Sequence, residues 1–286
     1  SPRPRVGTLP KVVERAGERF VVGDGGAPVG AAHLAGQHAA SFMDDDRRPL
    51  RPRLEGDPRQ RLLLRKLHQR LRPGEDGVAA FGSDDQMLVD LSSIDPAETC
   101  RFARELGQLC GMAWVDAPVA GDVRAAEDGE LLVLAGGHED DVERVRPLLE
   151  CFARRVTRMG DTGAGQVAKL CHQMLAGAAA FALAETIAFA ERSGIDAERL
   201  PEALVDGYAD SPTLQVLGPR MAVRQFEPVV SRLGTLARDL DTGVTAARAV
   251  GAAVPLSALA AQLLRQHALH TPPDEDLATL VELYSE

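Results

Sequence analysis

The chain has 286 residues, 45% of them apolar, and carries a formal net charge of −10 at pH 7. This length and apolar content are sufficient for one large domain or two ordinary ones with a buried core. The negative charge argues against a general binder of nucleic acids or anionic membranes, because such proteins need positive potential over an extended surface. We therefore expect a soluble globular protein in which any anion-binding site is local.

The cysteines and the hydropathy pattern give further expectations. No CxxC pair and no Cys/His ligand spacing occurs among the four cysteines, which are Cys100, Cys110, Cys151 and Cys171. The sequence shows no secretory leader, so we expect free thiols, no metal site and a cytoplasmic location. The longest apolar run, residues 174–184, is shorter than the roughly 20 residues that span a membrane. We therefore expect no transmembrane helix.

The first 80 residues are polar and their pattern is weak. Residues 11–24, KVVERAGERFVVGD, predict the end of a helix, a glycine turn and a strand. Further along, Asp57 and Pro58 predict the start of an amphipathic helix. This helix belongs to an arginine-rich stretch, residues 47–72. Two interpretations of that stretch remain open, a solvated surface and a phosphate-binding patch.

Residues 86–160 alternate short apolar runs with helical patterns, which is typical of βαβ units and a parallel sheet. The first helix is predicted to start at Asp95 and Pro96 and to stop at Gly111. Its apolar stripe consists of Phe102, Leu106 and Leu109. Residues 140–152 predict another helix, and residues 154–160 predict a last strand.

From residue 163 onward the strand signal is lost. The pattern predicts six helices, at about residues 166–192, 197–207, 212–223, 231–250, 255–268 and 274–284. Apolar residues lie on most sides of the first helix. Such a helix must be surrounded by other elements, either in its own domain or in a partner chain. We therefore expect an all-α second domain and dimerisation through it.

Four segments carry a family resemblance: VDLSSIDP, DAPVAGD followed by DGELLVLAGG, GDTGAGQVAKL, and ARDLDTGVTAARAVGAAVPL. In their order and spacing the chain resembles the β-hydroxyacid dehydrogenases, which include 3-hydroxyisobutyrate dehydrogenase, with imine reductases and 6-phosphogluconate dehydrogenase as more distant relatives. The resemblance implies an α/β Rossmann-like N-terminal domain, residues 1–162, that binds NAD or NADP. It also implies an all-α domain like that of 6-phosphogluconate dehydrogenase, residues 163–286, which begins with a long interdomain helix and forms a homodimer.

The resemblance assigns catalysis to Lys169, which stands at the position of the family's proton donor to a carbonyl oxygen. An ammonium group suits this chemistry because it stabilises a developing alkoxide and supplies a proton. Gln173 stands where relatives have a substrate-holding asparagine, and His172 stands where a second asparagine is common. We expect this face of the helix to line a polar cleft between the domains. The alternative for a lysine on a helix is a solvated, structurally neutral residue.

The remaining site residues follow from two other motifs. Ser92 and Ser93 match a strand-end motif that approaches nicotinamide and substrate in relatives, although strand-end serines are equally good helix caps. Ala120, Gly121 and Asp122 replace the Ser-Gly-Gly that binds a substrate carboxylate in relatives. Since alanine donates no side-chain hydrogen bond and Asp122 would repel an anion, a simple 2- or 3-hydroxy acid is a poorly suited substrate.

The dinucleotide-binding motif departs most from the family. A dinucleotide needs a strand, a tight glycine turn and a helix N-terminus whose bare N–H groups hold the pyrophosphate. Residues 3–17, RPRVGTLPKVVERAG, lack the GxGxxG spacing, and the glycines of residues 23–30 are misspaced and align with the end of the family's second strand. Asp24 is the candidate acid for the ribose. Arg238 replaces a lysine of the family's KDL motif and is the second candidate cofactor contact.

Three hypotheses of function follow. In the first, the enzyme uses Lys169 for acid-base or electrostatic work on a small carbonyl, imine or related metabolite, with no cofactor in the usual mode and no hydride transfer. In the second, it is an NAD(P)-dependent hydroxyacid dehydrogenase or imine/carbonyl reductase with an atypical cofactor loop. In the third, it is a non-catalytic dimeric scaffold. Binding of NADH or NADPH separates the first two.

Overall fold

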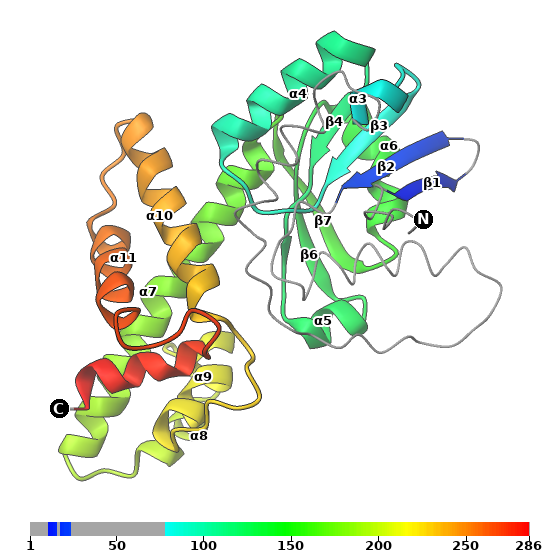
Figure 1. Ribbon diagram of the computed structural model, residues 1–286. Helices are drawn as coiled ribbons and strands as arrows, with labels where there is room; N and C mark the ends of the chain where they lie inside the picture. Colours follow the sequence, from blue (N-terminus) through cyan, green and yellow to red (C-terminus); the bar gives the residue numbers. More distant parts are fainter. Residues whose placement is uncertain (1–10, 16–17, 24–77, 286) are drawn as a thin grey trace, which may run out of the picture. The chain divides into compact units, whose positions relative to one another are not determined.

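A computed structural model describes residues 11–15, 18–23 and 78–285 (Figure 1). The chain forms two compact units, Ser1–Lys169 and Leu170–Glu286. The first is a Rossmann-like α/β unit and the second is helical, which confirms the predicted fold class. Helix α7, Ala164–Arg192, runs without a break from the first unit into the second, so the division predicted at residues 162/163 stays a prediction. The predictions for Asp24, the glycines at 25–30 and the arginine-rich stretch 47–72 lie outside the described residues.

The first unit is built on a mixed sheet, which among the described residues has seven strands in the order β1-β2-β3-β4-β6-β5, with β7 paired to β6. The strands are β1 (Lys11–Arg15), β2 (Glu18–Gly23), β3 (Gln86–Asp90), β4 (Ala113–Asp116), β5 (Val119–Ala120), β6 (Leu131–Gly136) and β7 (Ala153–Gly160). Strands β2, β3 and β4 are parallel, but β6 runs antiparallel to β4 and β5. The expectation of a parallel sheet is confirmed for β3 with β4 and for β6 with β7, but it is wrong for β6 against β4 and β5, because the chain turns back after β5 instead of crossing over.

The beginning of the sheet differs from the sequence prediction in two ways. Lys11–Arg15 is a strand and not the end of a helix, and it pairs antiparallel with β2 as a hairpin. Two adjacent β-branched residues, Val12 and Val13, favour this strand. The strand predicted at the end of this segment is confirmed as β2. It lies directly beside β3, with Gly23 opposite Asp90 in the register.

Helices cover both faces of the sheet because the strand residues alternate in direction. On one face, Leu88 and Trp114 pack with α4 (Pro96–Cys110). On the other face, Val89 and Val115 pack with α6 (Glu139–Leu149). Two short helices, α3 (Val78–Phe81) and α5 (Val123–Glu127), complete the described part of the unit.

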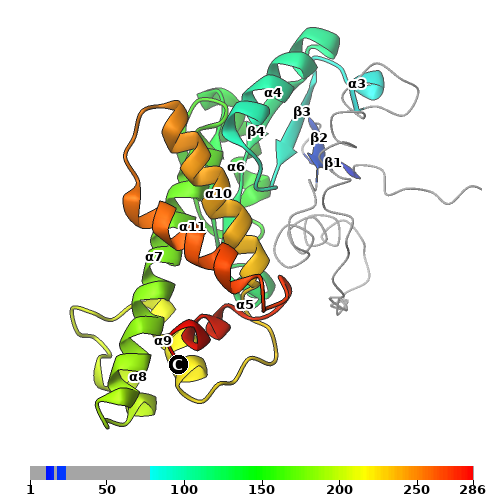
Figure 2. The same cartoon turned by 60° about the vertical axis from the view of Figure 1, so that its left-hand side comes forward.

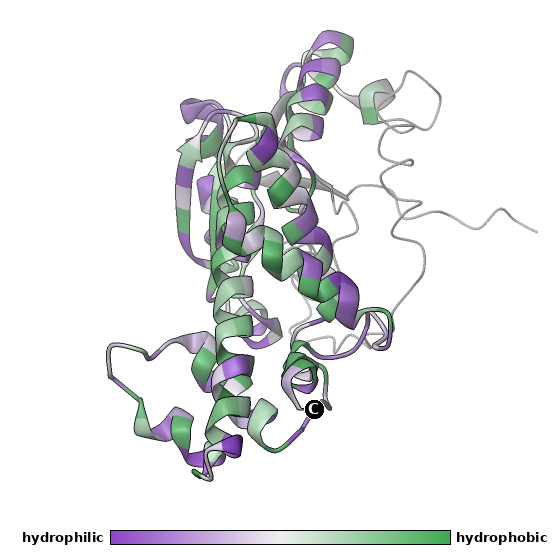
Figure 3. Cartoon of the chain, turned by 90° about the vertical axis from the view of Figure 1, so that its left-hand side faces the viewer, coloured by the Kyte–Doolittle hydropathy of each residue, from purple (hydrophilic) through white to green (hydrophobic). Residues whose placement is uncertain are grey.

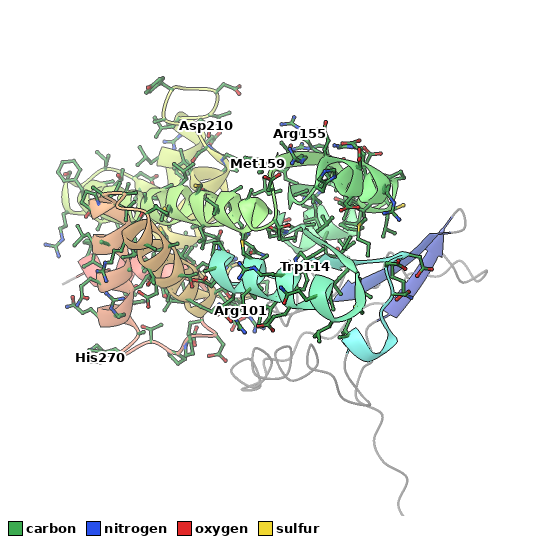
Figure 4. All side chains as sticks on the ribbon, turned by 90° about the horizontal axis from the view of Figure 1, so that it is seen from above. Arg101, Trp114, Arg155, Met159, Asp210 and His270 are labelled. Carbon is green, nitrogen blue, oxygen red and sulfur yellow. The ribbon has the colours of Figure 1, made fainter. Side chains whose placement is uncertain are left out.

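The ends of α4 are as predicted. The Asp95 side chain accepts hydrogen bonds from the backbone N–H groups of the first turn, and Gly111 closes the helix with a positive φ of 77°. Of the predicted stripe, Phe102 and Leu106 are buried, whereas Leu109 is 46% exposed. Arg101 on this helix forms ion pairs with Glu98 and Glu105 and lies over the ring of Phe102 (Figure 4).

The second unit contains the remaining helices, whose order matches the prediction. They are η1 (Ala197–Arg199), α8 (Leu200–Ala203), α9 (Pro212–Ala222), α10 (Leu233–Ala249), α11 (Pro255–His267) and η2 (Leu277–Tyr284), the η elements being 3-10 helices (Figure 2). The helix predicted at residues 197–207 is shorter, and the one predicted at 274–284 is a 3-10 helix. Their apolar faces pack against one side of α7, with Ile187, Leu240 and Leu264 fully buried.

Helix α7 is apolar along most of its length (Figure 3). Its length and composition alone would allow it to cross a membrane, but 44% of its apolar 18-residue stretch is buried inside the protein. Ala180, Ala184 and Ile187 belong to the core of the second unit. Other apolar side chains of the helix remain exposed, with Leu175 at 75% and Phe189 at 72%. The described residues therefore cover the helix only in part.

Candidate active site

The carboxyl end of β3 is organised by a buried carboxyl group. Asp90 Oδ1 accepts hydrogen bonds from Ser92 N at 3.0 Å and from Ser92 Oγ at 2.5 Å. Burial raises the pKa of Asp90 to about 7, against the lowering effect of these two hydrogen bonds. Its second oxygen, Oδ2, is buried and accepts no hydrogen bond from the described residues. Asp90 therefore holds the first part of the loop that follows β3 through Ser92.

The two strand-end serines have different environments. Ser92 is fully buried, and its hydroxyl donates to Asp90 and does not cap α4, whose cap is Asp95. Ser93 is half-buried, and its hydroxyl has no hydrogen-bond partner among the described residues.

Gln166, in the first turn of α7, was missed by the sequence analysis. Its Nε2 donates to the backbone oxygen of Ser92 at 2.8 Å, and its Oε1 accepts from the backbone N–H of Ile94 at 3.2 Å. The side chain is 1% exposed. The signal that could have found it is its spacing, since it precedes Lys169 by three residues on the same helix face.

The start of α7 is held by Asp116, the last residue of β4. Its carboxylate accepts from Gly163 N at 2.7 Å and from Gln166 N at 3.0 Å, which satisfies two of the helix's unpaired N–H groups. Burial raises the pKa of Asp116, and the bonds from Gly163 and Gln166 oppose that shift. A negative charge at a helix N-terminus is also favoured by the helix dipole.

The contact between the start of α7 and Asp116 explains the glycines that precede Lys169. Gly163 adopts a φ of +92°, which an L side chain rarely adopts. A Cβ on Gly165 would lie 2.8 Å from the backbone oxygen of Asp116 and would contact the backbone oxygen of Leu134 even more closely. The glycine-rich entry is therefore required for seating the helix on the carboxyl ends of β4 and β6.

Lys169 is half-buried and is the last residue of the first unit. Because it follows Gln166 by three residues, it lies on the face of α7 that contacts the loop of residues 92–94. Its neighbour His172 is exposed. Lys169 thus follows Gln166, the residue that contacts this loop, at an axial rise of about 4.5 Å along the helix.

In the second unit the structure brings together Gln173, Asp239 and Arg238. Gln173 Nε2 donates to Asp239 Oδ2 at 2.6 Å, and Arg238 Nε lies 3.6 Å from Asp239 Oδ1. Asp239 is 5% exposed, and its carboxylate is paired with one hydrogen-bond donor and one positive charge. The contact fixes the amide orientation, because the carboxylate can face only the NH₂ group. Gln173 therefore keeps its Oε1 as a hydrogen-bond acceptor.

The residues of the predicted carboxylate-binding turn have structural roles. Ala120 is buried in β5, and Gly121 adopts a φ of +141° where a Cβ would lie 2.7 Å from Leu131. Asp122 caps α5, accepting from Ala125 N at 2.8 Å. The described hydrogen bonds join this turn to neither of the strand-end serines. Asp122 is thus explained as a helix cap.

Three further predictions concern the cysteines, a metal site and the ribose contact. The four cysteines are free thiols, and Cys171 is exposed. Within the described residues there is no group of three or more His, Cys, Asp or Glu side chains that could hold a metal ion. Asp24, the predicted ribose contact, lies outside those residues, but it directly follows Gly23, the residue opposite Asp90.

Both halves of the chain match known families. Residues 66–160 match the family described as the NAD binding domain of 6-phosphogluconate dehydrogenase, and residues 163–284 match that described as NAD-binding of NADP-dependent 3-hydroxyisobutyrate dehydrogenase. The matched segments meet at the start of α7.

Individual relatives give the same picture. 2-Hydroxy-3-oxopropionate reductase from Escherichia coli is 34% identical over 209 residues, which cover 73% of this chain and 71% of the relative. 3-Hydroxyisobutyrate dehydrogenase from Pseudomonas aeruginosa is 33% identical over 219 residues, with 74% and 73% covered. The solved structure of Mycobacterium tuberculosis 3-hydroxyisobutyrate dehydrogenase with L-serine has a TM-score of 0.66 at 27% identity, covering 74% of each chain.

Proposed function

Because the chain belongs to the β-hydroxyacid dehydrogenase family of NAD(P)-binding oxidoreductases, we propose that it is an NAD(P)-dependent reductase or dehydrogenase of a small carbonyl or hydroxy compound. The observation that carries the proposal is the position of Lys169, one turn after Gln166 on the helix face that contacts the loop of residues 92–94. When bound, the nicotinamide supplies or accepts the hydride at the substrate carbon.

The strand order of this sheet supports binding of the cofactor. In the usual Rossmann strand order 3-2-1-4-5-6, the strand beside the fourth is the first, which leads into the glycine turn. Here β2 occupies the position beside β3 and ends at Gly23, opposite Asp90. In the sequence Gly23 is followed by Asp24, Gly25 and Gly26. This placement of β2 beside β3 supports a dinucleotide at the carboxyl edge of these two strands.

Lys169 acts on the substrate oxygen in this proposal. During reduction its ammonium group donates a proton to the carbonyl oxygen, and during oxidation the neutral amine takes that proton back. The positive charge also stabilises the alkoxide character of the transition state. Ser93, whose hydroxyl has no described partner, is the neighbouring hydrogen-bond donor.

Gln173 contributes to the choice of substrate. With its amide nitrogen bound to Asp239, it offers Oε1, which accepts hydrogen bonds from a hydroxyl or an ammonium group. In contrast, Ala120 offers no side-chain donor to a carboxylate, and the Asp122 carboxylate is used to cap α5. We therefore favour a substrate with a hydroxyl or amino group next to the reacting carbon and without a strict need for a carboxylate.

The assembly and location are further parts of the proposal. The exposed apolar residues of α7, Val167, Leu175 and Phe189, are suited to burial against a second copy of the chain, because large exposed apolar side chains mark association surfaces. Four free thiols are consistent with a reducing cytoplasm. We thus propose a cytoplasmic homodimer.

Titration with NADH and NADPH tests the proposed function. We expect binding of one of them at micromolar concentration and turnover with a panel that contains 2-hydroxy-3-oxopropionate, succinic semialdehyde and, in the oxidative direction, 3-hydroxyisobutyrate and L-serine. The panel also contains hydroxy- and amino-substituted carbonyl compounds without a carboxylate, which should be turned over at least as well. Lys169→Ala should abolish turnover but leave the melting temperature nearly unchanged, with Lys169→Arg as the charge-preserving control. Absence of binding with retained, Lys169-dependent chemistry would favour the hypothesis without hydride transfer, and absence of both would favour the scaffold hypothesis.

A further inference from the structure

We propose that Gln166 is a positioning residue of the reaction, and that it holds the loop of residues 92–94 at a fixed distance from Lys169. The inference rests on the proposed function, because it assigns the reaction to Lys169 and to the strand-end loop. It adds a residue that neither the sequence motifs nor the family resemblance had singled out.

The side chain of Gln166 uses both ends of its amide on one loop. Nε2 donates to the oxygen of Ser92 at 2.8 Å, and Oε1 accepts from the N–H of Ile94 at 3.2 Å. These two backbone groups lie on either side of Ser93. The amide therefore bridges the residue whose hydroxyl has no other described partner, and it fixes the backbone from which that hydroxyl projects.

The backbone of Gln166 is fixed as well. Its N–H donates to Asp116 Oδ2 at 3.0 Å, at the end of the neighbouring strand β4. One residue is thus bound through its main chain to β4 and through its side chain to the loop after β3. Because β3 and β4 are adjacent in the sheet, the first turn of α7 is held at two points of a rigid support.

Because both residues belong to one helix, fixing the position of Gln166 also fixes the backbone of Lys169. Lys169 follows Gln166 by three positions of α-helix, a rise of about 4.5 Å with no glycine or proline between them. A helix segment of this kind does not bend locally. A shift of the first turn therefore shifts the ammonium group relative to Ser93 by a similar amount, and misplacement of about 1 Å lowers a rate by up to about a hundredfold.

Burial makes the two hydrogen bonds hard to replace. Gln166 is 1% exposed, so water is not available to the Ser92 oxygen or the Ile94 N–H when the amide is removed. An unpaired buried polar group is costly, and the loop is expected to move toward solvent to avoid this cost. The consequence is a displaced loop, with a fold that otherwise persists because α4 and α6 pack elsewhere on the sheet.

The test uses two substitutions of Gln166 and one control substitution elsewhere, which changes the charge by the same amount as Gln166→Glu. Gln166→Met fills the same space without hydrogen bonds, and we expect kcat to fall roughly tenfold or more at every pH, with the KM for the carbonyl substrate changed less. Gln166→Glu has the shape of glutamine. Its ionised form repels the Ser92 oxygen, whereas its protonated form donates to it and still accepts from Ile94. Its kcat, relative to the wild type, should therefore recover as the pH falls. Gln108→Glu, at an exposed position of α4, should change neither quantity.

A second measurement does not depend on turnover. Amide hydrogen exchange in a peptide covering residues 91–97 should be faster in Gln166→Met, and in Gln166→Glu at neutral pH, than in the wild type. Wild-type kcat in an active Gln166→Met variant, unchanged exchange in that peptide, or absence of low-pH recovery in Gln166→Glu would overturn the inference. An inactive wild-type protein with NADH, NADPH and the carbonyl panel would instead contradict the proposed function itself.

Discussion

The amide nitrogen of Gln173 lies 2.6 Å from Oδ2 of Asp239 and connects α7 to α10. Since Asp239 is almost completely buried, the carboxylate is stabilised mainly by this amide and by Arg238. The pair gives Gln173 a single amide orientation. Any substrate group that meets Gln173 thus meets a hydrogen-bond acceptor whose direction is fixed by a residue 66 positions later in the chain.

Replacement of Asp239 by Asn should remove this fixed orientation. An asparagine amide can face Gln173 with either its oxygen or its nitrogen, so Gln173 is free to turn its NH₂ toward the substrate. We expect kcat/KM to fall roughly tenfold, the effect of losing about 1.4 kcal/mol of transition-state stabilisation. Steady-state kinetics with the best substrate of the panel measures it. Asp241→Asn, an exposed position on the same helix, is the control, and equal effects of the two substitutions would contradict the prediction.

The buried carboxyl group of Asp90 predicts a pH dependence of stability. Its folded-state pKa of about 7 is above the ordinary 3.8, chiefly through burial. Because the folded-state pKa is higher than the unfolded-state pKa, the folded protein binds this proton more tightly. The contribution of the group to stability is therefore complete below about pH 4 and is lost as the pH rises through about 7. Between about pH 5 and pH 8 the free energy of unfolding of the wild type should fall, relative to Asp90→Asn, by on the order of 2 kcal/mol. Urea denaturation across this range measures it, and parallel pH profiles for the two proteins would contradict the assignment.

Local signals in the sequence predicted much of this fold. The cap at Asp95, the stop at Gly111 and the helix order of the second unit are all properties of residues close together in the chain. The antiparallel course of β6 and the β1–β2 hairpin depend on pairing between strands, which a local pattern does not specify. At the site the resemblance named Lys169 and Gln173, but the contacts of Gln166 with residues 92–94 span more than 70 positions. Only the folded chain reveals such contacts.

Removal of the Asp116 carboxylate should weaken the start of α7. Asp116→Ala leaves the N–H groups of Gly163 and Gln166 without their acceptor in a buried place. We expect a loss of about 2–4 kcal/mol of stability, the sum of a lost helix cap and two unsatisfied donors. Asp116→Asn keeps one acceptor oxygen and should lose less. Chemical denaturation measures the loss, and faster amide exchange restricted to the first turn of α7 would locate it. A variant as stable as the wild type would show that water replaces the carboxylate.

A pair of glycine substitutions tests the close approach of α7 to the sheet. A Cβ on Gly165 would lie 2.8 Å from the backbone oxygen of Asp116, and neither the strand nor the helix can yield without breaking hydrogen bonds. Gly165→Ala should therefore destabilise the protein by about 2 kcal/mol or more. At Gly107, inside α4, the nearest atom to an added Cβ is 4.0 Å away. Gly107→Ala should accordingly stabilise the protein by about 0.5–1 kcal/mol, because alanine is the better helix former. Urea midpoints of the two variants should move in opposite directions, and a shift of both in the same direction would mean that α7 is not seated on the sheet as described.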